Sequence, residues 1–408
     1  MAELLLRNVR LPRDGAAVDV RVEGERIAAV APDLAPREGE EVIEGKGGLL
    51  LPGFVESHAH LDKTLWGLPW RSHAAGGRLE NRIEDERRFR AESGHDAGRQ
   101  AMALALAFLE RGTTRIRTHV DVDTGAGLRH LQGVLEARQR LRDVMELQVV
   151  AFPQSGLLMR PGTADLLRAA MREGAEVLGG LDPQGIDGDA AASLDLLFGI
   201  ADEAGCGLDI HLHEPGEGGA RTLDAILDRV QALGLQGRVA ISHGFCIGEV
   251  EAPRRAALLD RMARLQIAAV TVGTPYRGVP SLLECREAGV VLAAGNDGIR
   301  DAWTPYGSPD MLERAMLVGW RNNLRRDEEL GFAFDAVTSQ GALACGFSDY
   351  GLQPGCIADL VVVDARHVPE AVVVRPRREL VISRGRIVVR EGVPSASATI
   401  LGFNTPGA

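Results

Sequence analysis

The sequence contains little cysteine and no long apolar run. Its five cysteines are scattered, odd in number and form no C-x-x-C pair, so a disulfide framework is not indicated. No apolar run approaches the roughly 20 residues that a bilayer-spanning helix needs. The chain opens with Met-Ala-Glu rather than with a basic segment followed by an apolar one, so we expect no secretory signal. These absences predict a soluble, reduced, cytoplasmic protein without a membrane partner.

The sequence also lacks a basic excess and the common phosphate-binding motifs. Its formal net charge is −11 at pH 7, which argues against nucleic acid as a partner because no basic stripe is available to neutralise phosphates. Neither G-x-x-x-x-G-K-[ST] nor G-x-G-x-x-G occurs, so a nucleotide-phosphate cradle is unsupported. The G-x-S-x-G elbow is absent as well, and it would be expected of an α/β-hydrolase acting through a serine nucleophile.

The two ends of the chain share a β-strand pattern. Apolar and charged residues alternate over residues 18–23, which is the period of a half-buried strand. Near the other end, the apolar stretches 360–363 and 380–382 are also strand-like, and Arg384-Gly385 after them is a plausible hairpin turn. We therefore predict one small β-sandwich domain assembled from residues 1–50 and 351–408.

Between these ends, strand-like apolar segments alternate with helix-like segments, which is typical of a parallel α/β architecture. Residues 97–111 are a clear helix candidate, because Gly112 follows them as a helix C′ residue. The charged stretch 78–90 is expected to form a solvated helix or loop over the mouth of the domain. Eight strands over about 300 residues fit a (β/α)8 TIM barrel, so we predict a barrel domain over residues 51–350. The predicted strands are 51–58, 113–121, 145–153, 177–182, 207–213, 238–243, 268–273 and 290–296.

The first predicted barrel strand ends in two histidines. His58 and His60 are spaced i, i+2, so a strand points both imidazoles to the same side, where two neutral nitrogens can share one metal ion. Active sites of TIM barrels lie at the C-terminal ends of the strands. The alternative is a pair of hydrogen-bonded structural histidines. Further ligand-type residues at the ends of later strands would favour the metal site.

The fifth predicted strand carries three polar residues of one parity. Asp209, His211 and His213 alternate with apolar residues, so the polar set should face the barrel lumen. By parity alone His211 and His213 are equally good metal ligands. Glu214 falls out of phase with His211 and should lie where the strand gives way to the loop, a position that suits a general acid/base beside a metal.

Two further strand ends carry groups of the same kind. His243 follows the sixth predicted strand and Asp297 follows the eighth. A single histidine after an apolar strand is, taken alone, more often structural than catalytic. A carboxylate beside histidines is a natural ligand, and three histidines with one aspartate hold a divalent cation while leaving room for water, whose pKa the cation can lower to about 7.

Two residues are candidates for contact with a substrate. Gln154 ends the third predicted strand, and its amide offers one donor and one acceptor, the pairing that the amide edge of a heterocycle needs. A bond from Gln154 to the local loop backbone is an equally good interpretation. Trp303 and Tyr306 follow the eighth strand and could form an apolar wall for a planar ring, although ordinary packing is the default for either.

Motifs along nearly the whole chain match one known family. The segments concerned are 52–60, 118–122, 149–156, 179–183, 211–214, 242–243, 296–297, 299–301 and 358–362. They resemble the amidohydrolase superfamily, in particular its cytosine deaminase group, and they are also similar to the N-isopropylammelide amidohydrolases. The resemblance implies a distorted (β/α)8 barrel with one divalent metal ion held by His58, His60, His211 and Asp297, so it selects His211 over His213.

The resemblance also implies roles for the remaining residues. Glu214 would move protons between water, a ring nitrogen and the leaving amine, while His243 hydrogen-bonds the metal-activated water and Asp297 accepts its proton. Gln154 would recognise the amide edge of the ring. A His3Asp set accepts Zn²⁺, Fe²⁺ or Mn²⁺ depending on supply. A homo-oligomer is usual for such proteins.

These features predict a metal-dependent hydrolytic deaminase that releases ammonia from an aminated N-heterocycle. The isopropylammelide branch lacks the glutamine and glutamate found here at Gln154 and Glu214, which favours the deaminase side. Gly298 replaces an aspartate of the cytosine deaminases, and we expect this loss to enlarge the pocket, so that a pterin or a triazine would fit. The alternative is release of an N-alkyl amine, or opening of a cyclic amide, on the same scaffold. A catalytically silent barrel would be expected to lack these ligands.

Overall fold

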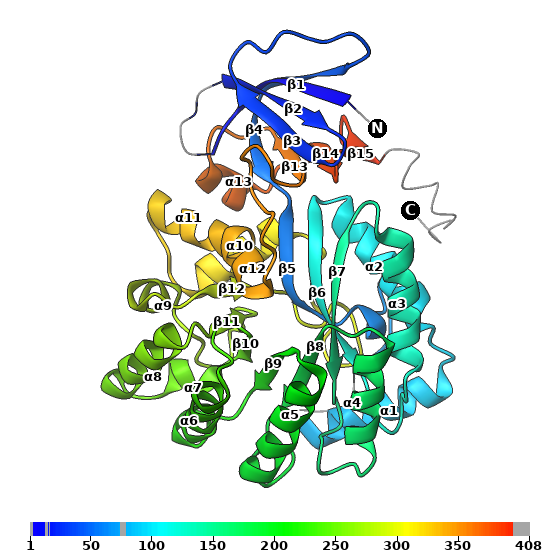
Figure 1. Cartoon of the computed structure of the whole chain (residues 1–408), viewed down its shortest axis with the longest axis vertical. Helices are drawn as coiled ribbons and strands as arrows, with labels where there is room; N and C mark the ends of the chain where they lie inside the picture. Colours follow the sequence, from blue (N-terminus) through cyan, green and yellow to red (C-terminus); the bar gives the residue numbers. More distant parts are fainter. Residues whose placement is uncertain (1–2, 13–14, 16, 74–78, 395–408) are drawn as a thin grey trace.

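The computed structural model describes residues 3–12, 15, 17–73 and 79–394. It contains a small sheet at one end and a larger barrel beneath it, as Figure 1 shows. Among the described residues, no helix combines the length and the apolar character that crossing a membrane requires. All five cysteines are free thiols.

The small sheet is built from both ends of the chain, as predicted. Its eight strands run in the order β16-β15-β14-β13-β4-β1-β2-β3, so β4 joins the N-terminal and C-terminal strands. Leu6, Val20, Leu360 and Ile382 from the two ends pack into one apolar core. The strands are β1 (Glu3–Arg10), β2 (Ala17–Glu23), β3 (Arg26–Ala31), β4 (Glu41–Pro52), β13 (Leu360–Val363), β14 (Arg378–Ser383), β15 (Arg386–Arg390) and β16 (Val393–Pro394).

The middle of the chain forms the predicted barrel. Eight parallel strands pair in chain order, and a bridge between Ala59 and Asp297 links the first strand to the segment after the last. The strands are β5 (Phe54–Ala59), β6 (Thr113–Asp121), β7 (Glu146–Phe152), β8 (Val177–Leu181), β9 (Gly207–Leu212), β10 (Val239–His243), β11 (Ala268–Thr271) and β12 (Leu292–Ala294).

The first barrel strand starts later than predicted. Leu51 and Pro52 pair with Val361 and Leu360 in the small sheet, and β5 begins only at Phe54. Gly53 stands between the two sheets, where a Cβ atom would lie 2.4 Å from Thr114 Oγ1. The apolar segment predicted as one strand therefore contributes first to the small sheet and then to the barrel, which its sequence pattern did not indicate.

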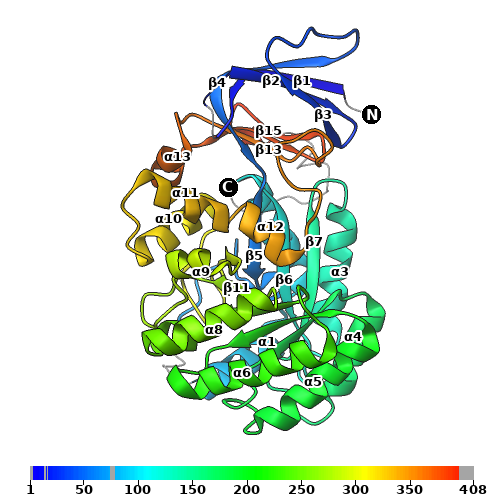
Figure 2. The ribbon, with the colours of Figure 1, turned by 60° about the vertical axis from the view of Figure 1, so that its left-hand side comes forward.

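Helices cover the outside of the barrel between its strands, as the turned view in Figure 2 shows. The predicted helix at 97–111 is observed as α2, and Gly112 beyond its end has a left-handed φ of 86°. The helices are a 3-10 turn (Leu61–Lys63), α1 (Leu79–Glu92), α2 (Ala97–Leu109), α3 (Arg129–Leu141), α4 (Thr163–Glu173), α5 (Ala190–Ala204), α6 (Gly216–Leu233), α7 (Phe245–Glu249), α8 (Ala252–Arg264), α9 (Leu282–Ala288), α10 (Met311–Arg321), α11 (Asp327–Ala336), α12 (Ser339–Cys345) and α13 (Val368–Val374).

The charged stretch predicted as a solvated helix or loop is helical but not solvated throughout. Helix α1 buries Glu86, and Arg90 of the same helix pairs with Asp121 at 2.9 Å and Asp123 at 3.2 Å. Ile83 packs in a cluster with Phe152. The expectation was wrong for this inner face because its charges find buried partners at the end of β6 and in the loop that follows it.

Candidate active site

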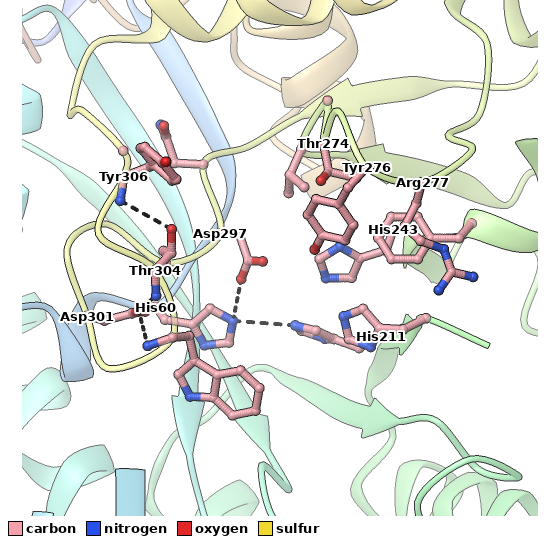
Figure 3. Close-up of a pocket in the computed structure, with 18 of the residues that line it drawn as sticks. His60, His211, His243, Thr274, Tyr276, Arg277, Asp297, Asp301, Thr304 and Tyr306 are labelled. Atoms are coloured by element: carbon pink, nitrogen blue, oxygen red, sulfur yellow. Dashed lines mark hydrogen bonds and ion pairs between the residues drawn. The ribbon is translucent and has the colours of Figure 1, made fainter. Parts of the chain in front are cut away.

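His58 in β5 and His60, directly after its end, point into the barrel beside Asp297. His58 is fully buried and His60 is 3% exposed. His60 Nε2 lies 3.2 Å from Asp297 Oδ1, and His58 Nε2 lies 3.6 Å from the same oxygen. Figure 3 shows the contact between His60 and Asp297. The i, i+2 spacing on a strand thus brings both rings to one carboxylate, as parity predicts.

At the end of β9, the structure distinguishes the two histidines that parity left equivalent: His211 lies in the strand and His213 directly after it. His211 Nε2 lies 3.4 Å from His60 Nε2, so the His211 ring belongs to the same cluster (Figure 3). His213 is held elsewhere: its Nδ1 is 2.7 Å from Asp182 Oδ2, and its backbone N–H donates to Asp182 Oδ1 at 2.6 Å. Burial opposes protonation of His213, but Asp182 raises its pKa above the ordinary value. His211 is therefore the member of the pair that faces His60.

Asp297 adopts a strained backbone conformation directly after β12. Its φ is 64°, a left-handed value that an aspartate adopts only when the surroundings impose it. Its backbone N–H donates to the His58 carbonyl at 2.7 Å, which fixes the turn. Burial favours the neutral acid, yet the adjacent rings of His58 and His60 hold the pKa of Asp297 well below its ordinary value. Asp297 is thus an anion facing two imidazoles.

The cluster has the donor atoms that a divalent cation requires. Ligand atoms of His58, His60, His119 and His211 lie within 4.8 Å of one another, and so do those of a second group in which His243 and Asp297 join His58 and His211. Burial and the charge of Lys63 lower the pKa of His60 to about 3, so its ring is neutral and carries a free lone pair. The predicted set of His58, His60, His211 and Asp297 is drawn from these two overlapping groups.

The tautomer of His58 supports this assignment of the cluster. Ser242 Oγ donates its only proton to Asp209 Oδ1 at 2.6 Å, so it accepts from His58 Nδ1 at 2.8 Å. The lone pair of His58 therefore lies on Nε2, which is buried without a hydrogen-bond partner among the described residues. A buried unpartnered nitrogen is unfavourable, and a bound cation would satisfy it.

His119 and Arg117 complete this support network and were not among the predicted site residues. Asp209 accepts from Arg117 Nη1 at 3.0 Å, and His119 Nε2 lies 3.3 Å from the same carboxylate. Burial alone would raise the pKa of Asp209, but His119 and Arg117 hold it well below the ordinary value. The signal in the sequence was the alternation of Arg115, Arg117 and His119 with apolar or small residues along β6.

Glu214 lines the pocket and is fixed by three donors. Its Oε1 accepts from the backbone N–H groups of Gln184 at 2.7 Å and Gly185 at 3.0 Å. Thr222 Oγ1 donates to Oε2 at 2.5 Å. The carboxylate thus has a defined orientation at the edge of the cavity, just beyond the end of β9, where the out-of-phase position predicts it.

His243 ends β10 with a φ of 68°, and its ring faces the cluster from the other side (Figure 3). Its ring centroid lies 5.0 Å from that of His58 and 4.1 Å from that of His213. Neither ring nitrogen has a hydrogen-bond partner within the described part of the chain. Burial and the nearby His213 lower the pKa of His243 well below the ordinary value, so the ring is neutral and can accept a hydrogen bond.

Lys63, three residues after His60, is a pocket residue that was not predicted. Its Nζ donates to Gln154 Oε1, lies 3.4 Å from Asp121 Oδ1 and stands 5.6 Å from the ring of Trp303. Burial disfavours the charge, but Asp121 and Glu86 raise the pKa of Lys63 above the ordinary value. The side-chain oxygen of Gln154 therefore accepts from Lys63, and its Nε2 remains as a donor. Gln154 can thus accept fewer hydrogen bonds from a substrate than we expected.

The pocket over the cluster is about 1400 Å³ in volume. Gln154 and Trp303 line it, together with Lys63. Trp303 is partly buried and packs against the cluster of Ile83 and Phe152. Exposed aromatic side chains at its mouth are Tyr276, Tyr306 and Trp320. The cavity is large enough for a substituted aromatic ring.

Gly298 does not enlarge this pocket in the way expected. A Cβ atom on Gly298 would lie 2.1 Å from Asp301 Oδ2. The Asp301 side chain, which is 1% exposed, thus occupies the space that a side chain at position 298 would need. The expectation was wrong because a carboxylate from three residues later fills the vacated position.

Comparisons with known proteins agree with this geometry. The model of the amidohydrolase family matches residues 41–389. The N-isopropylammelide isopropyl amidohydrolase of Pseudomonas sp. (strain ADP) is 31% identical over 403 residues, covering 96% of this chain and 98% of that protein. The crystal structure of N-isopropylammelide isopropylaminohydrolase from Burkholderia multivorans ATCC 17616 has a TM-score of 0.94 and 56% identity, covering 97% of this chain and 100% of that one.

A deaminase is also similar over nearly the full length. The crystal structure of 5-methylcytosine deaminase from Klebsiella pneumoniae, liganded with 5-fluorocytosine, has a TM-score of 0.85 and 26% identity, covering 96% of this chain and 98% of that one. The resemblance inferred from the motifs, to both the deaminase and the isopropylammelide branches, is thereby confirmed. The barrel, the histidine and aspartate cluster and these matches lead to one conclusion: the chain belongs to the amidohydrolase family and is a hydrolase of carbon–nitrogen bonds other than peptide bonds.

Proposed function

We propose that this protein is a metal-dependent hydrolase that releases an alkylamine from a ring carbon of an N-alkylated aminotriazine, of which N-isopropylammelide is the model substrate. The convergence of His58, His60, His211 and Asp297 at one end of the barrel carries the hydrolytic part. The 56% identity to an N-isopropylammelide isopropylaminohydrolase over nearly the whole chain supports the substrate class. This choice reverses the preference for ammonia release that Gln154 and Glu214 suggested.

The metal would be held by His58, His60, His211 and Asp297, with zinc or iron, and also manganese, suited to such a set. A divalent cation at this position supplies Lewis acidity that lowers the pKa of water toward neutrality. Ser242 and Asp209 keep the Nε2 lone pair of His58 directed at the site. Such outer partners orient the ligands of metal sites in general.

Hydrolysis forms a bond from the water oxygen to the ring carbon and breaks the bond from that carbon to the exocyclic nitrogen. His243, neutral and with free ring nitrogens, hydrogen-bonds the attacking water in this scheme, and Asp297 accepts the proton that the water gives up. Glu214 at the cavity edge receives this proton, delivers it to the adjacent ring nitrogen and then moves it to the leaving amine as the carbon–nitrogen bond breaks. The products are a ring hydroxyl and a free amine.

The opposite wall binds the ring. Trp303 provides an aromatic face, and Lys63, with its charge close to that face, attracts electron-rich oxygen substituents. Gln154 adds its Nε2 donor beside Lys63. A triazine that carries ring oxygens matches two adjacent donors of this kind.

The second candidate function is release of ammonia from an aminated ring, as in the cytosine deaminases, and the similarity to 5-methylcytosine deaminase favours it. The deciding experiment incubates the purified protein, with defined zinc, iron or manganese content, with N-isopropylammelide, cytosine, 5-methylcytosine and a pterin. Mass spectrometry then identifies isopropylamine, ammonia and the ring product. Release of isopropylamine with the highest kcat/KM supports the proposal, preferential ammonia release supports the deaminase, and a ring-opened acid or no product with any metal overturns both.

A further inference from the structure

Asp301 is a buried carboxylate in the pocket wall that the proposed chemistry does not use. It follows Asp297 by four residues, is 1% exposed and lines the cavity. Its Oδ1 accepts from the backbone N–H groups of Trp303 at 2.8 Å and Thr304 at 2.9 Å. Figure 3 shows Asp301 within the loop that carries Thr304 and Tyr306. One oxygen of Asp301 therefore shapes the loop that presents Trp303.

The second oxygen of Asp301 has no such task. Oδ2 is buried and has no hydrogen-bond partner among the described residues. It lies where a Cβ atom of Gly298 would be, at 2.1 Å, so the glycine makes room for it. An asparagine would satisfy the two N–H groups equally well, and burial of an unpartnered carboxylate oxygen is unfavourable. Asp301 Oδ2 is thus a hydrogen-bond acceptor that the fold does not require.

The neighbouring polar groups of the wall are donors. Lys63 directs its ammonium group at Glu86, Asp121 and Gln154, and in the described part of the chain Asp301 forms no ion pair within 4.0 Å. The oxygen of Gln154 is engaged by Lys63, which leaves the Nε2 donor. Two donors and one carboxylate acceptor complement a ring that presents an oxygen next to an N–H group.

We propose that Asp301 is a substrate-positioning residue whose Oδ2 accepts a hydrogen bond from a ring N–H of the heterocycle, with the adjacent ring oxygen directed at Lys63 and Gln154. This inference rests on the proposed function and specifies the substrate further: the ring must carry an unsubstituted amide-like edge. In this arrangement Asp301, three positions later, supplies a carboxylate in place of the aspartate that the cytosine deaminases carry at the position of Gly298.

The electrostatics of the site agree with this role. Burial raises the pKa of Asp301 to about 7, although the charge of Lys63 opposes the shift. A ring N–H that donates to Oδ2 would satisfy the oxygen and favour the ionised carboxylate. Substrate binding would thus remove an unfavourable feature of the free protein.

Asp301→Asn is the sharpest test, because asparagine keeps the Oδ1 acceptor for Trp303 and Thr304 and puts an N–H donor in place of Oδ2. Asp189→Asn is the matched control, since Asp189 caps α5 through one oxygen, at 3.0 Å from Ala192 N, and lies outside the pocket. Both full-length variants are assayed with the best substrate of the panel and with its ring-N-methylated analogue, at equal metal content.

We expect Asp301→Asn to raise KM about 10- to 100-fold, because two donors would then face each other, while Asp189→Asn leaves KM unchanged. The wild-type protein should discriminate against the N-methylated ring at least about 10-fold, and Asp301→Asn should lose that discrimination. A merely structural role would not produce this second effect. Unchanged KM and unchanged discrimination in Asp301→Asn overturn the inference.

Failure of the proposed function is distinguished by binding. If the wild-type protein releases no amine from any ring, calorimetric titration with N-isopropylammelide, cytosine and their N-methylated analogues replaces turnover. Loss of affinity and of discrimination in Asp301→Asn then supports the inference although the proposed function has failed. Equal affinities in the wild-type protein and in Asp301→Asn, or absence of binding to the wild-type protein, overturn it.

Discussion

His213 Nδ1 lies 2.7 Å from Asp182 Oδ2, and the same aspartate accepts from the backbone N–H of His213. These two hydrogen bonds engage His213 with Asp182, which itself has a left-handed φ of 35°, whereas His211 Nε2 lies 3.4 Å from His60 Nε2. Two histidines that are equivalent by strand parity thus have different surroundings, and the difference can be measured.

We expect His211→Ala to lose bound metal and His213→Ala to keep it. His211 Nε2 faces His60 Nε2 at 3.4 Å, whereas His213 is occupied by Asp182. Removal of one of the four proposed ligands should weaken metal binding by more than about tenfold. The measurement is metal content by mass spectrometry after dialysis against a weak chelator. Metal loss in His213→Ala with retention in His211→Ala would show that the ligand is the other histidine.

Ser242→Ala should weaken metal binding about 10- to 100-fold, because Ser242 orients His58 through Nδ1. The control is Ser383→Ala, which removes a buried hydroxyl from the small sheet. Competition with a chromogenic chelator gives the two affinities. If both variants bind metal equally well, His58 does not depend on this hydrogen bond.

Glu214→Gln should keep the metal and lower kcat about 100-fold or more, because glutamine cannot transfer the proton. The amide retains an oxygen for the N–H groups of Gln184 and Gly185, so the loop should stay in place. Glu217→Gln, on the exposed side of α6, is the control and should turn over normally. Near-normal turnover by Glu214→Gln at full metal content would refute the proton-transfer role.

Asp301→Asn should become more stable relative to the wild-type protein as the pH rises from 4 to 7. Because burial raises the native pKa to about 7 and the unfolded value is about 3.9, the native state alone binds this proton in that window. The Asp301 carboxyl therefore lowers the wild-type free energy of unfolding by at most about 1.4 kcal/mol for each unit that the pH rises. Asp301→Asn lacks this carboxyl, so its free energy of unfolding does not contain this contribution. Urea unfolding at pH 4 to 8 measures the difference, which should grow up to pH 7 and then level off. A constant difference would mean that Asp301 is ionised throughout.

Local patterns determined the architecture of this protein. The period of two along β5, β6 and β9 places their polar residues in the lumen, and the alternation of strands and helices predicts a barrel. Both properties depend on residues a few positions apart, so they can be predicted from the sequence alone. The predicted strands therefore correspond to β5 through β12, and the ends of five of them supply the predicted residues of the candidate site.

Tertiary structure decided what parity and spacing leave open. It paired His213 with Asp182 across neighbouring strands, placed Lys63 against Gln154, buried the inner face of α1 against β6, and filled the space beside Gly298 with Asp301. Each of these depends on side chains from distant segments or on the path of a loop, and no periodic pattern encodes such contacts. The sequence alone thus determined which residues face the barrel lumen, while the fold decided which partner each of them meets.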